Sequence, residues 1–324
     1  MNLATKPDVS VVIATYNRCE VLRGALQSLL HQETAGFAYE VIIVDNNSTD
    51  DTVGVIEEQR HGVSGCSLHY RFEKKQGISH ARNNGVAVAR APIIAFTDDD
   101  IKPAPDWVAK VYESFKRFPD ADCIGGKVLP DPATKFPGWL TEHHWTPLAL
   151  MDLGDEPLVL DVVNGAGLIG ANLAVRASVF KDVGQFLPDL QRVKDSIGSL
   201  EDTEFELRLA AAKKRLMYVP ELVVYAQVLD ERLDKAYHRR WYCGHGHFYA
   251  VMRNDKFEES KLRLFDVPAH LYRSTFSNVF NWLRYRLTNE QELGFQRELE
   301  LRFFWGFFRK RFSERQSLLR LKQR

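Results

Sequence analysis

Three consecutive aspartates, Asp98, Asp99 and Asp100, are the residues of this chain best suited to do chemistry. They follow the apolar residues 93–97, which suit a buried strand, and open α/β sheets bind ligands beyond the carboxyl ends of their strands. Because adjacent carboxylates repel one another, we expect a cation beside them, most simply Mg²⁺ or Mn²⁺ carrying a substrate's phosphates. The alternative is a solvated acidic loop in which an aspartate caps a helix before Pro103.

A second acidic pair, Glu201 and Asp202, begins a segment that ends in the basic residues 213–215. Acids in the first turn and bases beyond the last turn match the helix dipole, so capping is one interpretation of the pair. A carboxylate at a helix N-terminus is also what a general base requires. Local sequence does not separate these two interpretations.

Three histidines, His238, His245 and His247, lie within ten residues and raise the question of zinc. Their spacing matches no standard zinc site. Polar surface groups, or groups beside a phosphate, are the simpler interpretation.

The elements that must position these residues follow an alternating pattern. Short β-branched runs alternate with amphipathic helical patterns over the first 100 residues, at residues 9–14, 40–44, 67–72 and 93–97. Such alternation predicts an α/β fold with a mainly parallel sheet and right-handed crossovers. If these strands are neighbours, the polar residues 15–18 and 45–50 lie beside Asp98. Neither GxGxxG nor GxxxxGK[ST] follows the first strand, so a nucleotide would be held by another arrangement.

Beyond Asp100 the pattern is less regular. We expect a helix at 107–118, a strand at 121–129 interrupted by Gly125 and Gly126, irregular chain at 130–157, a glycine-rich segment at 162–176, a mobile loop at 189–200 and a strand at 222–228. The predicted division is a sheet-containing domain at 1–235 and a helical extension at 236–324 that faces a membrane or forms an oligomer.

Composition narrows the function. The formal net charge of the 324 residues is zero, which argues against nucleic acid as the main partner. Four widely spaced cysteines and the absence of an apolar core in residues 1–8 favour a cytoplasmic protein. The aromatic and basic residues 303–312 are open to three interpretations: a core-packing helix, a dimer contact, or an interfacial anchor at the inner face of the membrane.

Six pieces of this sequence, in order, resemble the family 2 glycosyltransferases, which are inverting, nucleotide-sugar-dependent enzymes of the GT-A fold. The pieces are residues 11–18, 44–50, Gly77 with 81–85, 96–100, 170–176 and 201–204. The resemblance covers about residues 8 to 225, and its specificity lies in the combination.

The resemblance implies roles on the donor side. Asp45 would bind the nucleotide base, Thr15 and Arg18 would line the nucleotide pocket, and Arg82 would approach the base or the diphosphate. Asp98 and Asp100 correspond to the outer carboxylates of the family's metal motif, with Asp100 the more direct ligand of Mg²⁺ or Mn²⁺. Asp99 would contact the sugar or the ribose.

On the acceptor side, the resemblance makes Asp202 the general base and Glu201 a neighbour in contact with the acceptor. Asn172 would border the donor sugar and acceptor, and His238 or His245 would complete the metal site. One departure is Leu200, where the family often has glycine before the acidic pair. The implied partners are a nucleotide diphosphate sugar, with a UDP-sugar preferred, and a glycan or lipid-linked glycan whose hydroxyl accepts a hexose-type unit in bacterial-type surface glycan synthesis.

Two other functions compete with this prediction. A sugar nucleotidylyltransferase usually carries a glycine-rich basic loop after the first strand, which residues 14–18 lack. A non-catalytic glycan- or nucleotide-binding module would have no need of both the aspartate triplet and Asp202.

Overall fold

The computed structural model describes residues 6–34, 36–60, 66–191, 197–253, 258 and 262–322, with side chains up to residue 317. The chain forms two compact units. The first, here called the sheet unit, comprises Met1–Lys135, Leu148–Pro188 and Glu201–Val228; the second, the helical unit, comprises Phe136–Pro147, Asp189–Leu200 and Leu229–Arg324. The boundary predicted after residue 235 stays a prediction. Of the loop predicted at 189–200, residues 192–196 lie outside the described residues.

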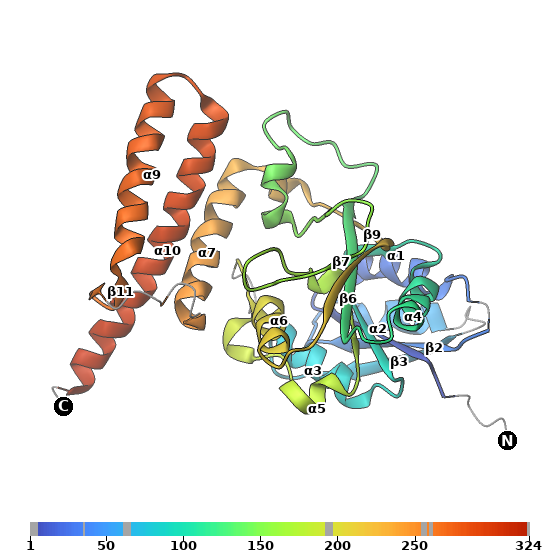
Figure 1. Cartoon of the computed structure of the whole chain (residues 1–324). Helices are drawn as coiled ribbons and strands as arrows, with labels where there is room; N and C mark the ends of the chain where they lie inside the picture. Colours follow the sequence, from blue (N-terminus) through green and yellow to red (C-terminus); the bar gives the residue numbers. More distant parts are fainter. Residues whose placement is uncertain are drawn as a thin grey trace. The chain divides into compact units, whose positions relative to one another are not determined.

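The sheet unit is built on nine strands in the part of the chain that the structure describes (Figure 1). They are β1 (Val9–Thr15), β2 (Tyr39–Asp45), β3 (Cys66–Phe72), β4 (Ile93–Asp98), β5 (Ile101–Pro103), β6 (Cys123–Pro130), β7 (Leu158–Val159), β8 (Leu173–Arg176) and β9 (Leu216–Ala226). Their order is β3-β2-β1-β4-β8-β6-β9-β5, with β7 also paired to β9.

The first four strands of the chain are parallel neighbours, as the alternating pattern predicts. The helices that alternate with the strands are α1 (Cys19–Leu30), α2 (Thr52–Arg60), α3 (Ile78–Val88), α4 (Trp107–Arg117), α5 (Val179–Val183) and α6 (Glu201–Ala211). The sheet becomes mixed beyond β4, because β8 runs antiparallel to both β4 and β6. The predicted α/β class with a mainly parallel sheet is confirmed.

Strand β9 begins at Leu216, six residues before the predicted start. Residues 216–221 were not predicted as strand because they include Pro220. Proline cannot donate a hydrogen bond to a neighbouring strand and is normally found at sheet edges or bulges. Here it lies in a bulge, since the register between β6 and β9 shifts between Gly125 and Lys127. A Cβ on Gly126 would lie 2.1 Å from the carbonyl oxygen of Leu222, so the bulge requires glycine at this position.

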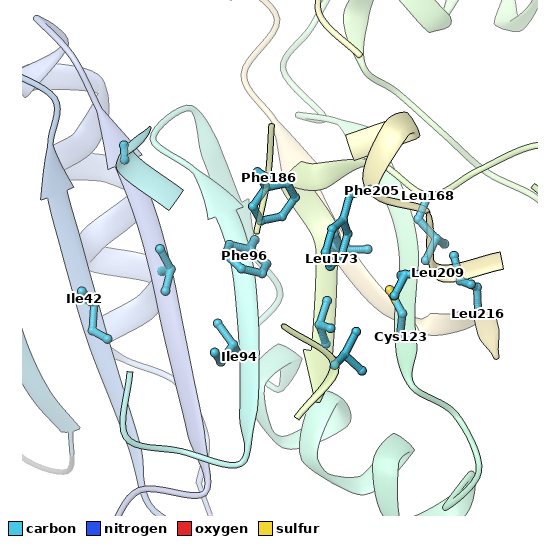
Figure 2. Close-up of a cluster of buried hydrophobic side chains, with 14 of the residues drawn as sticks. Ile42, Ile94, Phe96, Cys123, Leu168, Leu173, Phe186, Phe205, Leu209 and Leu216 are labelled. Atoms are coloured by element: carbon cyan, nitrogen blue, oxygen red, sulfur yellow. The ribbon is translucent and has the colours of Figure 1, made fainter. Parts of the chain in front are cut away.

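A buried apolar cluster covers one face of this sheet (Figure 2). Phe96 of β4 packs edge-on against Phe186, with ring centroids 5.4 Å apart, and Phe186 in turn packs against Phe205 of α6 at 4.7 Å. The cluster thereby fixes α6 against the sheet, close to the carboxyl end of β4.

The helical unit contains α7 (Lys235–Met252), α9 (Ala269–Leu287), α10 (Gln291–Lys322) and a hairpin of β10 (Arg263–Leu264) and β11 (Val267–Pro268) (Figure 1). Its core includes Phe307 of α10, packed with Ala250, Val267 and Leu271. Phe307 and Arg311 are fully buried, which favours the core-packing interpretation of residues 303–312. No helix among the described residues has the length and hydropathy needed to cross a lipid bilayer.

Candidate active site

The carboxyl ends of β1, β2 and β4 meet at one edge of the sheet. Thr15 is in register with Asp45, and Ala14 is in register with Asp98. This confirms the predicted convergence of the polar strand ends. Because the three strands are parallel neighbours, the loops that follow them leave the sheet side by side.

The loops after β1 and β2 are joined by hydrogen bonds. Asn17, with a left-handed φ of 50°, accepts from the backbone N–H of Thr49 at 2.7 Å, and its own N–H donates to the Ser48 hydroxyl at 3.0 Å. Asparagine tolerates this conformation better than other residues with a side chain. Asp50 accepts from the N–H of Cys19 at 2.9 Å, so the N-terminus of α1 is fastened to the same loop.

Asp45 and Asn46 fix the next part of this edge. Asp45 is buried and accepts from the Ser48 N–H at 2.8 Å and the Tyr70 hydroxyl at 3.1 Å. Asn46 donates to the carbonyl of Lys75 at 2.6 Å and accepts from the N–H of Gly77 at 2.7 Å. It thereby shapes the turn that enters α3. Sequence analysis missed Asn17 and Asn46, although asparagines in turns after strands are a general signal for such bonds.

The aspartate triplet forms the turn between β4 and β5. A strand follows it, so the alternative of an aspartate capping a helix before Pro103 is wrong. Arg18 donates to Asp99 at 2.5 Å and to Asp100 at 3.0 Å, and the Thr15 hydroxyl donates to the other oxygen of Asp99 at 2.8 Å.

The three aspartates differ in their surroundings. The side chain of Asp98 is 31% exposed and that of Asp100 is 11% exposed, whereas Asp99 is buried and bonded through both oxygens. Burial raises the pKa of Asp99 to about 7; the neighbouring carboxylates add to this rise and Arg18 opposes it. The burial of Asp99 does not support direct contact with a sugar or ribose, and suits a role in holding Arg18.

Arg82 of α3 connects the triplet to the second acidic pair. It is 3% exposed, and its guanidinium donates to Asp98 at 3.2 Å and to Glu201 at 3.3 Å. Burial alone would lower the pKa of Arg82, but the carboxylates of Asp98, Asp202 and Glu201 raise it. The guanidinium also lies 5.6 Å from the ring centroid of Phe186, so the apolar cluster of Figure 2 supports it from below.

Asp202 lies in the first turn of α6, beside Arg82. One of its oxygens accepts from the backbone N–H of Gly170 at 3.0 Å. A Cβ on Gly170 would lie 2.7 Å from both Asp202 Oδ2 and Arg82 Nη2, so only glycine allows these groups to approach. Glu206, one turn later, is buried and accepts from the N–H of Leu168 at 2.9 and 3.1 Å. Sequence analysis missed Glu206, because its position on α6 gave no sign that it bonds the glycine-rich segment.

The prediction that Asn172 contacts a sugar or acceptor is not supported. The residue is 0% exposed, and its amide donates to the carbonyls of Lys127 and Leu222, both at 2.9 Å. Its oxygen accepts from the indole N–H of Trp107 at 2.8 Å. Asn172 therefore joins β6, β9 and α4 beneath the site.

His238 and His245 belong to the helical unit. His238 is fully buried and packs against the rings of Trp139 and His144, and the ring of Phe295 packs on the same two residues. Burial lowers the pKa of His238 to about 4. His245 stacks on Trp241 at 4.3 Å, and burial lowers its pKa to about 4 as well. Within the described ranges, no three His, Cys, Asp or Glu side chains gather as a metal site. Burial does not support acceptor contact for His238, and a metal role for either histidine stays a prediction.

Comparison of the sequence with known proteins identifies the family of the chain. The model of glycosyl transferase family 2 matches residues 10–184, more than half of the chain. A glucosyl-dolichyl phosphate glucuronosyltransferase of Haloferax volcanii is 28% identical over 233 residues, which cover 70% of this chain and 71% of that protein. A validoxylamine A glucosyltransferase of Streptomyces hygroscopicus subsp. jinggangensis is 36% identical over 48% of this chain, but the match spans only 37% of that relative.

Among solved structures, the mannosyltransferase PcManGT from Pyrobaculum calidifontis, in complex with GDP-Man and Mn²⁺, has a similar fold. Its TM-score is 0.58 at 17% identity, and the match covers 97% of this chain and 75% of that one. The chain is therefore a glycosyltransferase with the GT-A fold, and it belongs to glycosyl transferase family 2.

Proposed function

We propose that the chain transfers a sugar, with inversion, from a nucleotide diphosphate sugar to a hydroxyl acceptor, and that Asp202 is the general base. The observation that carries the proposal is the position of Arg82, which bonds both Asp98 at 3.2 Å and Glu201 at 3.3 Å. One guanidinium thus spans the distance between the aspartate triplet and the start of α6. A sugar held beside the triplet is then within reach of a base on α6.

On the donor side, we assign Asp98 and Asp100 to a divalent cation, Mg²⁺ or Mn²⁺. Two carboxylates with partly exposed side chains fit such an ion, which prefers hard oxygen ligands and completes its shell with phosphates and waters. When bound, the ion would neutralise charge on the departing diphosphate. We assign Thr15, Arg18, Asp45 and Arg82 to the surroundings of the nucleotide. UDP is our preferred nucleotide, and the GDP-Man complex of PcManGT makes GDP the alternative to test.

The proposed mechanism is a single displacement. The acceptor oxygen attacks the anomeric carbon from the side opposite the diphosphate, its proton passes to Asp202, and the bond from the anomeric carbon to the phosphate oxygen breaks. The Gly170 N–H bonds one oxygen of Asp202 and holds the carboxylate in orientation. Arg82 keeps Glu201 and Asp98 in place and adds positive charge on the donor side.

For the acceptor, we propose a glycan or a lipid-linked glycan. The support is the name of the Haloferax volcanii relative, which identifies a lipid-linked substrate for that protein. We assign the transfer chemistry to residues 1–235 and leave residues 236–324 as a helical extension with a separate role.

The first test concerns the base. Asp202→Asn should lower the transfer rate by about 10² to 10⁴-fold, the usual contribution of a general base, while nucleotide binding by calorimetry stays near wild type. Glu204→Gln is the matched control, because Glu204 lies in the same turn of α6 and pairs with Arg208. Normal turnover by Asp202→Asn would refute the assignment.

The second test concerns the donor side. UDP and GDP should each be titrated with and without Mn²⁺, and at least one should bind in an ion-dependent manner that Asp100→Asn weakens. Asp106→Asn is the control, since Asp106 precedes α4 and its side chain makes no capping hydrogen bond. Unchanged binding by Asp100→Asn, with and without a chelator, would remove the metal assignment.

A further inference from the structure

Besides the apolar residues that pack in the core of the helical unit, helix α9 carries a second apolar set on the face that points away from α10. Leu271 and Asn278 are buried and face the rest of the helical unit, and Asn278 accepts from Arg297 of α10 at 3.5 Å. On the opposite face, an apolar stripe is exposed to solvent: Phe276 at 74%, Phe280 at 70% and Leu287 at 88%, with Val279 and Leu283 between them. These positions recur every three or four residues, so they form one continuous stripe.

An exposed apolar stripe is not what an ordinary surface helix presents. Such a helix normally turns its apolar stripe to the core and its polar residues to water. A contiguous exposed apolar patch of this kind marks a binding surface. In Figure 1, α9 and α10 run alongside each other as the long helices of the unit, and α10 covers only one side of α9.

The charges beside the stripe indicate the chemistry of a partner that would fit it. Helix α9 contains Arg273, Arg284 and Arg286 and no Asp or Glu. By helical geometry, Arg273 and Arg284 lie about 60–80° from Phe276 on one side, and Arg286 lies about 80° away on the other. Among the described residues none of the three forms an ion pair with a carboxylate, whereas several bases of α10 do, for example Arg297 with Glu300 and Lys310 with Glu314.

We propose that α9 docks on an anionic lipid surface, with the stripe of Phe276, Val279, Phe280, Leu283 and Leu287 at the boundary of the acyl chains and the three arginines on lipid phosphates. An apolar face with basic flanks is the pattern of an interfacial helix. A second copy of the chain fits less well, because a two-fold contact through this face would bring unpaired arginines together without an acid on either α9.

This surface differs from residues 303–312, the segment that the sequence singled out. Phe307 and Arg311 of that segment are fully buried, and Phe304 and Phe308 pack against the core of the helical unit. Membrane contact is therefore assigned to α9, and α10 is its support.

The test is flotation of the full chain with vesicles of phosphatidylcholine, with or without phosphatidylglycerol. Wild type should bind the anionic vesicles, and raised salt should release it. The double variant Phe276→Ser with Phe280→Ser should lower the partition coefficient by more than about tenfold. Replacing the three arginines by glutamine should lower it by about 10²-fold, at roughly 1 kcal/mol for each charge.

The control variant is Phe72→Ser with Val159→Ser, which removes an exposed aromatic and an exposed aliphatic side chain from the sheet unit. It should bind vesicles like wild type, and circular dichroism should show all variants folded. The proposal is overturned if wild type ignores phosphatidylglycerol or if the phenylalanine variant floats like wild type. It is also overturned if the chain forms a dimer that the phenylalanine variant breaks, with no vesicle binding. Because the assay measures lipid binding alone, its outcome is independent of sugar transfer.

Discussion

In the part of each unit that the structure describes, one buried arginine is held by carboxylates, and the two arginines have different roles. Arg82 in the sheet unit bonds Asp98 and Glu201, and Arg311 in the helical unit pairs with Glu258 and Asp266. Both guanidiniums are almost completely removed from solvent. Burial and the type of partner are therefore the same for both arginines. Neither property distinguishes a ligand-binding site from a cluster of ion pairs that only stabilises the fold.

The charge balance of the surroundings does distinguish them. Around Arg82, two guanidiniums face five carboxylates, namely Arg18 and Arg82 against Asp98, Asp99, Asp100, Glu201 and Asp202. Around Arg311, the described residues place four cations against three carboxylates, namely Arg253, Arg263, Lys310 and Arg311 against Glu258, Asp266 and Glu314. The pKa of Arg82 is raised by its carboxylates, whereas burial lowers that of Arg311. An excess of negative charge is satisfied by a cationic ligand, and a network without such an excess needs none.

The largest expected effect comes from removing each arginine. Arg82→Met and Arg311→Met should each lower the free energy of unfolding by about 3–5 kcal/mol, because each removes a buried guanidinium that is ion-paired with two carboxylates. Adding Mn²⁺ should restore part of this loss in Arg82→Met, since the excess of acids there has grown, and restore none in Arg311→Met. Urea unfolding with and without Mn²⁺ measures both values. Equal ion responses in the two variants would remove the distinction between the clusters.

Neutralising one acid in each cluster should have opposite signs. Asp100→Asn should raise the stability of the ligand-free protein by about 1 kcal/mol, because it relieves repulsion among the aspartates, as is common when an active-site charge is removed. Asp266→Asn should lower it by about 1–2 kcal/mol, because Asp266 contacts Arg253, Arg263 and Arg311. Thermal unfolding in the presence of a chelator gives both shifts, and two shifts of the same sign would contradict the comparison.

The arrangement of the first four strands of the sheet unit could be predicted from the sequence. The β-branched runs are flanked by polar turns, and parallel strands must place their carboxyl ends together, so the meeting of Thr15, Asp45 and Asp98 could be predicted. The start of β9 could not, because Pro220 lies in a bulge whose partner, Gly126, is almost a hundred residues away. In the helical unit, Phe307 and Phe280 look alike in sequence, but only Phe307 is buried. Which aromatic face is covered depends on tertiary packing.

At the candidate active site, the residue types predicted which side chains lie together, but they did not predict the hydrogen-bond partners of each side chain. The predicted residues that do lie together are Arg82, Asp98, Glu201 and Asp202. The amide of Asn172, in contrast, forms its hydrogen bonds with Trp107 and two backbone carbonyls. Local sequence carries no record of such partners, because each is distant along the chain. The assigned catalytic and ligand-binding roles therefore await the tests on Asp202 and Asp100.

The smallest expected effect comes from Glu206, a buried carboxyl group that forms no ion pair with any residue the structure describes. Burial, with the nearby carboxylate of Asp202, raises the pKa of Glu206 well above the ordinary value of 4.5. A raised folded-state pKa means that this group's stabilisation is complete below the unfolded-state pKa and is lost as pH rises through the folded-state pKa. Glu206→Gln stays neutral, so it should match wild type near pH 4.5 and become more stable than wild type, by on the order of 1 kcal/mol, toward alkaline pH.

Urea unfolding of both proteins across this pH range measures that difference, and Glu204→Gln is the control, because Glu204 is paired with Arg208. A difference between Glu206→Gln and wild type that does not change with pH would show that Glu206 is ionised in the folded protein. The N–H of Leu168 would then be bonded to a carboxylate, and a third, uncompensated negative charge would lie beside Asp202 and Glu201. That result would enlarge the charge excess of the sheet unit and strengthen the contrast with Arg311.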